Sequence, residues 1–241
     1  MFARISSMSI PSILRSLRGT FKNHGACAAS YDFAIRTLNR CVYYKDLRCF
    51  VVDKVDTKSL DLPARFRFMS LDDSLLLELA KQPENELDAR FVRYALHKGD
   101  QCYGIFDGDS LANYGWYSRK ATLMDNEELF FHFDPRFVYM YKGFTLEKYR
   151  GLRLHAISKT RALAEFLSRG AAGMFSYVES NNVNSIKSSR RMGARPCGRI
   201  QVARLAGRYF VRPDARCREY GLTMKPVSAS PPEDSLSLAI R

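Results

Sequence analysis

The sequence has few of the residues that build metal centres or disulfide frameworks. It contains six cysteines and four histidines in 241 residues, and the cysteines stand far apart, with no Cys-x-x-Cys pair and no nearby histidine at metal-ligand spacing. Zinc sites and disulfide-rich scaffolds depend on such spacings. The sequence therefore predicts neither a metal site nor a disulfide framework.

The sequence also lacks a long apolar run. No stretch approaches the roughly 20 apolar residues that a membrane-spanning helix needs, so we expect a soluble, cytoplasmic protein. Residues 1–31 contain no Asp or Glu, are rich in serine and carry Arg4, Arg15, Arg18 and Lys22. This composition resembles an organelle-targeting presequence, and it fits a basic N-terminal arm or a surface helix equally well.

Acidic residues are scarce relative to basic ones. The chain has 38 Lys and Arg against 25 Asp and Glu, a formal net charge of +13. This excess favours an anionic partner, which can be a phosphorylated cofactor, a nucleic acid or an acidic membrane surface. The densest basic group consists of Lys187, Arg190, Arg191, Arg195 and Arg199. It is either a solvated basic face or part of a binding surface.

The first half of the chain alternates predicted strands and helices. Residues 47–55 and 65–69 have the β-branched, aromatic or alternating pattern of strands. The leucines that follow Ser70 and the segment 86–98 have the spacing of two helices, of which the second ends at Gly99. Three further strands are predicted at residues 102–106, 111–119 and 129–145, the last broken near Asp134–Pro135.

The second half continues this alternation. A helix over residues 152–169 has one broad apolar face, which predicts that it packs on a sheet. A short strand follows at 174–178, and Asn181–Asn182 can cap a helix that ends at Gly193. Residues 197–211 predict a hairpin. The Ser- and Pro-containing tail from Met224 onward is predicted to be disordered.

One stretch of this second half has a pattern suited to anions. From Tyr139 to His155 the chain reads as a strand, an Arg-Gly turn and a helix start. A helix N-terminus presents unpaired N–H groups and the positive end of the helix dipole, so such a turn can hold a phosphate or pyrophosphate. An ordinary β-to-α turn has the same pattern. On this stretch alone, both interpretations stay open.

The order of predicted elements from Arg65 to Val211 resembles the GNAT N-acetyltransferase superfamily, whose members move an acyl group from coenzyme A to an amine. Two motifs carry the resemblance. The segment Lys148–His155 (KYRGLRLH) is similar to the family's pyrophosphate turn, Arg/Gln-x-x-Gly-x-Gly/Ala. The second motif, Asn182-x-x-Ser185 continuing through Ser189 to Gly193, is similar to Asn-x-x-Ala-x-x-x-Tyr-x-x-x-Gly-Phe.

The resemblance implies an α+β fold with a mixed, mostly antiparallel central sheet flanked by helices on both faces. It divides the chain into a basic N-terminal extension (1–60), a GNAT-like acyltransferase domain (61–223) and a tail (224–241). It also implies an acyl-CoA-dependent N-acyltransferase in which a primary amine attacks directly in a ternary complex. The co-substrate would be acetyl-CoA or another acyl-CoA, without a metal.

The resemblance also places the donor. Acyl-CoA would lie between the strands at 139–145 and 174–178, splayed apart near Lys142–Gly143, where Gly143 suits close approach by the pantetheine arm. A main-chain N–H near Tyr141 would polarise the thioester carbonyl. The implied cofactor-binding residues are Tyr141, Gly143, Thr145, Arg150, Gly151, Leu152, Arg153, Leu154, His155, Asn182 and Ser185.

Two positions depart from the family pattern. Arg153 stands where the first motif has a glycine, so it could crowd the pyrophosphate or add a charge-assisted contact. Ser189 stands where many relatives place the tyrosine that protonates the departing thiolate. A serine hydroxyl is a poor acid at neutral pH, and the proton could therefore come from another group or from water.

The attacking amine must be neutral, so some group has to take its proton. Candidates on or beside the predicted strands are His132, Glu179, Asp134 and Glu128, although a lone strand histidine is commonly structural. The candidate catalytic residues are therefore His132, Glu179, Tyr141 and Ser189. Trp116 and Tyr117 could line an acceptor pocket or belong to the core.

Three other functions stay open. Because of Arg153 and Ser189, the chain could be a GNAT-like module that has lost turnover and serves as a binding or scaffold domain. It could instead take its acyl group from acyl-carrier protein, an acidic partner that a basic surface would attract. Nucleic-acid binding through residues 187–199 is a third function, which no pattern of paired aromatic and basic residues supports.

Overall fold

The computed structural model describes residues 10–124 and 128–227. Its strands are β1 (Tyr43–Val52), β2 (Phe66–Leu71), β3 (Gln101–Asp107), β4 (Ser110–Ser118), β5 (Thr122–Leu123), β6 (Leu129–His132), β7 (Val138–Thr145), β8 (Met174–Glu179), β9 (Arg195–Leu205), β10 (Arg208–Pro213) and β11 (Thr223–Pro226). Its helices are α1 (Ile10–Cys41), α2 (Asp73–Leu79), α3 (Ala89–Lys98), α4 (Leu154–Ser168), α5 (Val183–Arg191) and α6 (Ala215–Glu219), with 3₁₀ turns η1 (Thr57–Ser59), η2 (Pro83–Asn85) and η3 (Glu147–Tyr149).

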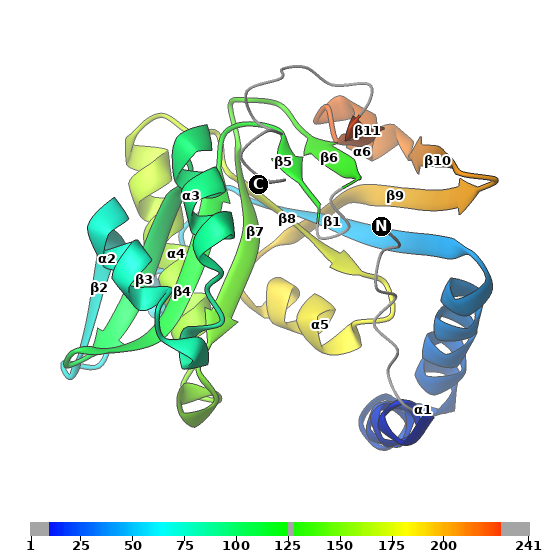
Figure 1. The fold of residues 1–241 in the computed structure, drawn as a ribbon, viewed down its shortest axis with the longest axis horizontal. Coiled ribbons are helices and arrows are strands. Elements are labelled where there is room, and N and C mark those ends of the chain that lie inside the picture. The colour runs from blue at the N-terminus through cyan, green and yellow to red at the C-terminus, as the bar shows by residue number, and fades with distance from the viewer. Residues whose placement is uncertain (1–9, 125–127, 228–241) are drawn as a thin grey trace.

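A large mixed sheet forms the centre of the molecule (Figure 1). Its eight strands lie in the order β10-β9-β1-β8-β7-β4-β3-β2, and β11, β6 and β5 form a second sheet. Within the described residues, β7 and β8 are the one parallel pair, and the other pairings are antiparallel. The predicted α+β fold with a mostly antiparallel sheet is confirmed.

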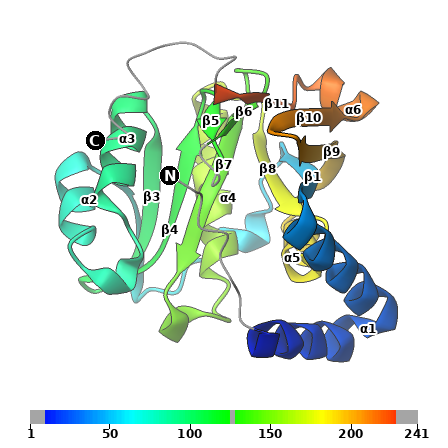
Figure 2. The same cartoon turned by 45° about the vertical axis from the view of Figure 1, so that its right-hand side comes forward.

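Both faces of the large sheet are covered. On one face α4 packs through Leu163 and Phe166 against residues of β3, β4 and β7, and Ile186 of α5 packs on the same cluster. On the other face α2 and α3 cover β3 and β4, as Figure 2 shows. The small sheet covers β1, β8 and β9 on that second face, where Phe131 and Met224 enter the core. Within the described residues, no helix is both long and apolar enough to cross a membrane.

Local sequence sets the ends of the helices. Asp88 accepts hydrogen bonds from the amides of Arg90 and Phe91, the second and third residues of α3, and Gly99 ends that helix in the left-handed conformation, where glycine has no steric penalty. Asn182 caps α5 through its side chain, which accepts from the Ser185 amide. The predicted helices at 86–98 and 152–169 are confirmed, as is the hairpin at 197–211, which turns at Ala206–Gly207. The segment 129–145 splits at its predicted break into β6 and β7, which belong to different sheets.

The N-terminal part of the chain enters the sheet. The sequence sets residues 1–60 apart as an extension, whereas β1 lies between β8 and β9 and pairs with both. Its residues Leu47, Cys49 and Val51 are almost fully buried, which explains the difference: the predicted strand has an apolar face that the small sheet covers. The helix that precedes it, α1, is kinked at Gly25, whose φ is +82°.

The C-terminal boundary also differs from the prediction. The sequence places a disordered tail from Met224 onward, but residues 224–226 belong to β11 and pair with β6. The Met224 side chain is 3% exposed and packs in the core beneath the small sheet. Burial of this apolar side chain accounts for the added strand. Residues 228–241 lie outside the described residues.

Candidate active site

The parallel strands β7 and β8 pair only at their beginnings. Val138 pairs with Met174 and Tyr139 with Phe175, and the register goes no further. Beyond this point β7 continues to Thr145 and β8 to Glu179. Residues 140–145 of β7 and residues 176–179 of β8 do not pair with each other, and we call these two segments the strand divergence. It includes Lys142–Gly143, where the sequence predicts that the strands separate.

Tyr141 lies in a β-bulge at the start of the strand divergence. On β4 the register passes from Trp116, opposite Lys142, to Tyr117, opposite Met140, so Tyr141 is the extra residue. The extra residue of a bulge is left out of the ladder, and β8 no longer pairs with β7 here. The position therefore fits the predicted role of a main-chain donor near Tyr141.

The Tyr141 side chain belongs to a buried polar network that the sequence did not indicate. Its hydroxyl donates to Asp100 Oδ2 at 2.8 Å, and Lys98 Nζ lies 2.8 Å from the same oxygen. Lys98 also donates to Thr122 at 2.8 Å and to Ser118 at 3.2 Å. Burial, followed by the Asp100 charge, raises the Tyr141 pKa well above its ordinary value. The phenol is therefore a poor proton donor.

The turn before α4 exposes backbone donors at the far end of the divergence. Gly151 has φ +86° and Arg153 has φ +61°, and both residues are exposed. The first helical hydrogen bond runs from Ile157 N to Arg153 O, so the amides of residues 154–156 precede the helical ladder. Arg153 makes no capping hydrogen bond with its side chain. The local geometry is that of an anion-binding helix N-terminus.

The side chains of the two arginines in this turn, Arg150 and Arg153, each contact a neighbouring segment of the chain. Arg150 Nε donates to the Thr145 carbonyl at 3.3 Å. The Arg153 guanidinium lies 3.4 Å from Ser59 Oγ in η1, so the side chain extends toward that turn. The left-handed backbone of a non-glycine residue costs about 1 kcal/mol, which gives a physical reason for the glycine that the family motif has there.

His155 packs against Gly143 across the divergence. A Cβ at Gly143 would lie 2.9 Å from His155 Cε1 and 2.8 Å from Met140 Cε, so the glycine lets these side chains approach the β7 backbone. Burial, with a smaller contribution from the Lys159 charge, lowers the His155 pKa to about 4. The imidazole is therefore neutral at physiological pH, and a donor arm that follows Gly143 would contact its ring.

Lys159 lies one helical turn after His155 and is the second group that sequence reasoning missed. It is 4% exposed, and its Nζ donates to Ser176 Oγ of β8 at 3.1 Å. Across residues 10–124 and 128–227, no carboxylate lies within ion-pair distance of it. Burial lowers its pKa to about 8. No pattern in the sequence distinguishes it from an exposed lysine.

The second motif forms the start of α5. Asn182 Oδ1 accepts from the Ser185 amide at 3.1 Å, which makes the asparagine a helix cap. Ser189 is 5% exposed, and its carbonyl accepts from Met192 N and Ala194 N at the end of the helix. Ser189 therefore lies on the packed side of α5, and its assignment as a catalytic residue stays a prediction.

The candidate bases lie on different elements. His132 is in β6 of the small sheet, half-buried, and burial and the nearby Lys225 lower its pKa, so the imidazole is neutral at pH 7. Glu179, at the end of β8, forms an ion pair with Lys45 of β1. The roles of these two residues as bases stay predictions.

The remaining candidates have structural partners. Asp134 forms an ion pair with Arg136 at 2.7 Å, and Glu128 forms one with Arg204 at 2.9 Å. Trp116 and Tyr117 are at most 1% exposed, so they belong to the core and do not line an acceptor pocket. In the described part of the chain, no three His, Cys, Asp or Glu side chains group as a metal site.

Comparison with known proteins gives similarity at the level of structure. No protein-family model matches the chain, and no curated protein matches it. A putative GNAT-family acetyltransferase from Novosphingobium aromaticivorans is 18% identical, with a TM-score of 0.48, over 66% of this chain and 64% of that chain. A GCN5-related N-acetyltransferase-like protein from Streptococcus suis is 17% identical, with a TM-score of 0.47, over 76% and 68%.

A tandem GNAT protein from the clavulanic acid biosynthesis pathway is 11% identical, with a TM-score of 0.46, over 78% of this chain and 55% of that one. The chain thus spans less than two thirds of the Novosphingobium protein and about half of the tandem protein.

Proposed function

We propose that this chain is an acyl-CoA-dependent N-acyltransferase of the GNAT type. The observation that carries the proposal is the strand divergence, which begins beside the Tyr141 bulge and ends at the uncapped N-terminus of α4. It combines the two groups that acyl transfer from a phosphorylated thioester requires. One is a donor for the oxyanion, and the other is a site for the pyrophosphate.

In this proposal the pyrophosphate binds at the start of α4. The amides of residues 154–156 and the positive end of the helix dipole face the anion. Gly151 adopts the positive φ of the turn, +86°, and the space in front of it is open, since nothing lies within 4 Å of the position that a Cβ would occupy. Arg150 is exposed at the same turn and adds a guanidinium that suits a phosphate.

The pantetheine arm would then follow β7 past Gly143 and His155 to the bulge. A main-chain N–H at Tyr141 would donate to the thioester oxygen as it becomes an oxyanion, which contributes a few kcal/mol in comparable acyl transfers. Asp100 and Lys98 would act through Tyr141 as positioning residues, because they fix the phenol and with it the bulge.

Lys159 is the proton donor that we assign to the leaving group. The amine nitrogen bonds to the acyl carbon, the carbon–sulfur bond breaks, and the thiolate takes a proton from the Lys159 ammonium. A donor with a pKa of about 8 is well matched to a thiol whose ordinary pKa is about 8.5. Lys159 would thus supply the acid that Ser189 cannot. His132 and Glu179 stay the proposed acceptors of the amine proton.

Titration calorimetry with acetyl-CoA tests the donor site. We expect micromolar binding that Arg150→Ala weakens by about tenfold, the loss of one charge-assisted contact. The matched control is Arg208→Ala, an exposed arginine of β10, and it should bind as the unmodified protein does. If both variants bind acetyl-CoA equally well, the pyrophosphate does not bind at the α4 turn.

A thiol-release assay over a panel of amines then tests turnover. Release with any primary amine supports the transferase and excludes the scaffold alternative. Binding without release over the whole panel would favour a binding module, which the ion-paired Glu179 and the buried Ser189 are compatible with. If acetyl-CoA does not bind, acylated acyl-carrier protein is the donor to titrate next.

A further inference from the structure

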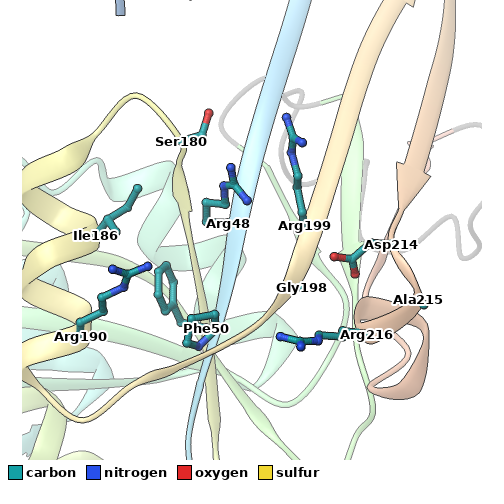
Figure 3. A pocket seen from close by; sticks show the side chains of 11 residues that line it. Arg48, Phe50, Ser180, Ile186, Arg190, Gly198, Arg199, Asp214, Ala215 and Arg216 are labelled. Carbon is teal, nitrogen blue, oxygen red and sulfur yellow. The ribbon is translucent and has the colours of Figure 1, made fainter. Parts of the chain in front are cut away.

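A second pocket lies outside the proposed donor site. It has a volume of about 560 Å³ and opens between α5, the strands β1 and β9, and the start of α6. Figure 3 shows four arginine side chains around it, from these separate elements: Arg48, Arg190, Arg199 and Arg216. None of the residues assigned above to the donor is among its lining residues.

The arginines of this pocket repel one another. Arg48 of β1 and Arg199 of β9 are direct partners in the antiparallel register, and like charges in that arrangement are destabilising. Asp46 offsets Arg199, because its Oδ2 accepts from Arg199 Nη2 at 2.8 Å. Among the described residues, no carboxylate lies within ion-pair distance of Arg48, Arg190 or Arg216.

The two carboxylates nearest to the pocket have other partners. Asp214, the acidic residue of the lining, caps α6 by accepting from Cys217 N at 2.8 Å. Asp46 accepts from the Tyr31 hydroxyl at 2.8 Å in addition to its bonds with Arg199. The lining therefore carries more positive charge than the protein itself neutralises.

Part of the remaining lining is apolar. Phe50, Ile186 and Pro196 form part of the wall, and Phe50 is almost fully buried beneath it. Small-molecule sites commonly have volumes of roughly 300–1,000 Å³, with apolar walls and a few polar groups. A concave pocket of this size fits one small anion better than an extended nucleic acid or a protein surface does.

We propose that this pocket binds a phosphorylated small molecule whose non-phosphate part is apolar. The phosphate would lie between the guanidinium groups of Arg48, Arg190 and Arg216, because guanidinium groups form paired hydrogen bonds with phosphate oxygens. The apolar part would contact Phe50 and Ile186. The bound anion would also screen the repulsion between Arg48 and Arg199.

Titration calorimetry with phenyl phosphate, alongside inorganic phosphate, tests this proposal in the full-length protein. We expect saturable binding of phenyl phosphate that is tighter than that of inorganic phosphate. The double variant Arg48→Gln with Arg190→Gln should weaken it by at least about tenfold, since each charge-assisted hydrogen bond contributes roughly 1.5–3 kcal/mol.

The matched control is Arg208→Gln with Arg212→Gln on β10, which removes the same charge from exposed positions outside the pocket. It should retain the phenyl phosphate affinity. Equal weakening in both double variants would mean that net charge alone attracts the ligand, and would overturn the proposal. Absence of saturable phenyl phosphate binding would overturn the proposal as well. The same holds if a single-stranded oligonucleotide binds and phenyl phosphate does not. If the pocket variant does not fold, Arg216→Gln gives the same test.

Discussion

The side chains of Lys98 and Lys159 are both largely buried, and their surroundings differ. Lys98 has an 8% exposed side chain and lies 2.8 Å from Asp100, with Ser118 and Thr122 accepting its other hydrogen bonds. Lys159 is 4% exposed and donates to Ser176 alone in the described structure. Burial lowers the pKa of both, but at Lys98 the Asp100 charge acts in the opposite direction.

This difference is the basis on which we propose a structural role for Lys98 and a functional role for Lys159. A buried charge without a counterion is costly, so a chain that keeps one has a use for its proton or its charge. Lys98 has its partner within the fold. Lys159 donates to Ser176, the first residue of β8 beyond its pairing with β7, and in our proposal the acyl donor is its partner.

Lys98→Met should give the largest effect, because it leaves Asp100 as a buried charge without its cation. Breaking a buried pair in this way costs about 3–5 kcal/mol, so the free energy of unfolding in urea should fall by that amount. An unchanged free energy of unfolding would mean that Tyr141 alone satisfies Asp100, and the contrast between the two lysines would be lost.

Lys159→Met should lower the rate of thiol release without lowering the free energy of unfolding. The methionine fills the same space without a buried charge, so the free energy of unfolding should stay the same or rise. The rate of thiol release should fall by about a hundredfold or more, the typical effect of losing a general acid. The matched control is Lys54→Met, an exposed lysine, which should keep full activity. Loss of stability without loss of rate would make Lys159 a structural residue.

The free energy of unfolding should depend on pH through two groups of α4, His155 and Lys159. The folded pKa of His155, about 4, lies below the ordinary value of 6.5, so the unfolded chain binds a proton first as the pH falls. Stability is therefore lost between about pH 6.5 and 4. The Lys159 pKa of about 8, below 10.5, predicts that stability rises between pH 8 and 10.5.

Each slope should reach up to about 1.4 kcal/mol per pH unit. Urea midpoints measured across both ranges give these slopes. His155→Gln should remove its contribution to the acid slope, whereas the exposed His97→Gln should not. An acid slope that survives His155→Gln unchanged would contradict the assignment to His155.

The smallest expected effect is at the first turn of α4. Arg153→Gly and Arg153→Ala both remove the contact with Ser59, but only glycine adopts the left-handed backbone without penalty. The glycine variant should therefore unfold at a higher urea concentration than the alanine variant, by about 1 kcal/mol in free energy. Equal stabilities would show that the turn relaxes to another conformation.

Local patterns in the sequence predicted the elements well, because caps, turns and apolar spacing act over a few residues. Asp88 and Gly99 delimit α3, and Asn182 begins α5, as their chemistry requires. The insertion of β1 between β8 and β9 was not predictable in this way. It joins Cys49 to Tyr177 and Gly198, and pairing over such sequence separations depends on the whole core.

The candidate site was predictable to a similar extent. The turn from Arg150 to His155 could be read from spacing, whereas the role of Tyr141 near the thioester came from the family resemblance and stays a prediction. Lys159 and Asp100 could not, because an ionisable residue looks the same in sequence whether it is exposed or buried. Lys159 and Asp100 differ from exposed ionisable residues because they are buried, and the packing of α4 and α3 sets this burial.

The binding of acetyl-CoA as a function of pH tests the account most directly. If Lys159 contacts the donor, the affinity measured by calorimetry should change between pH 7 and 9, around its pKa of about 8. Lys159→Met should bind with an affinity that does not change over this range. A pH dependence that is the same in Lys159→Met, or no binding of acetyl-CoA at any pH, would contradict the account.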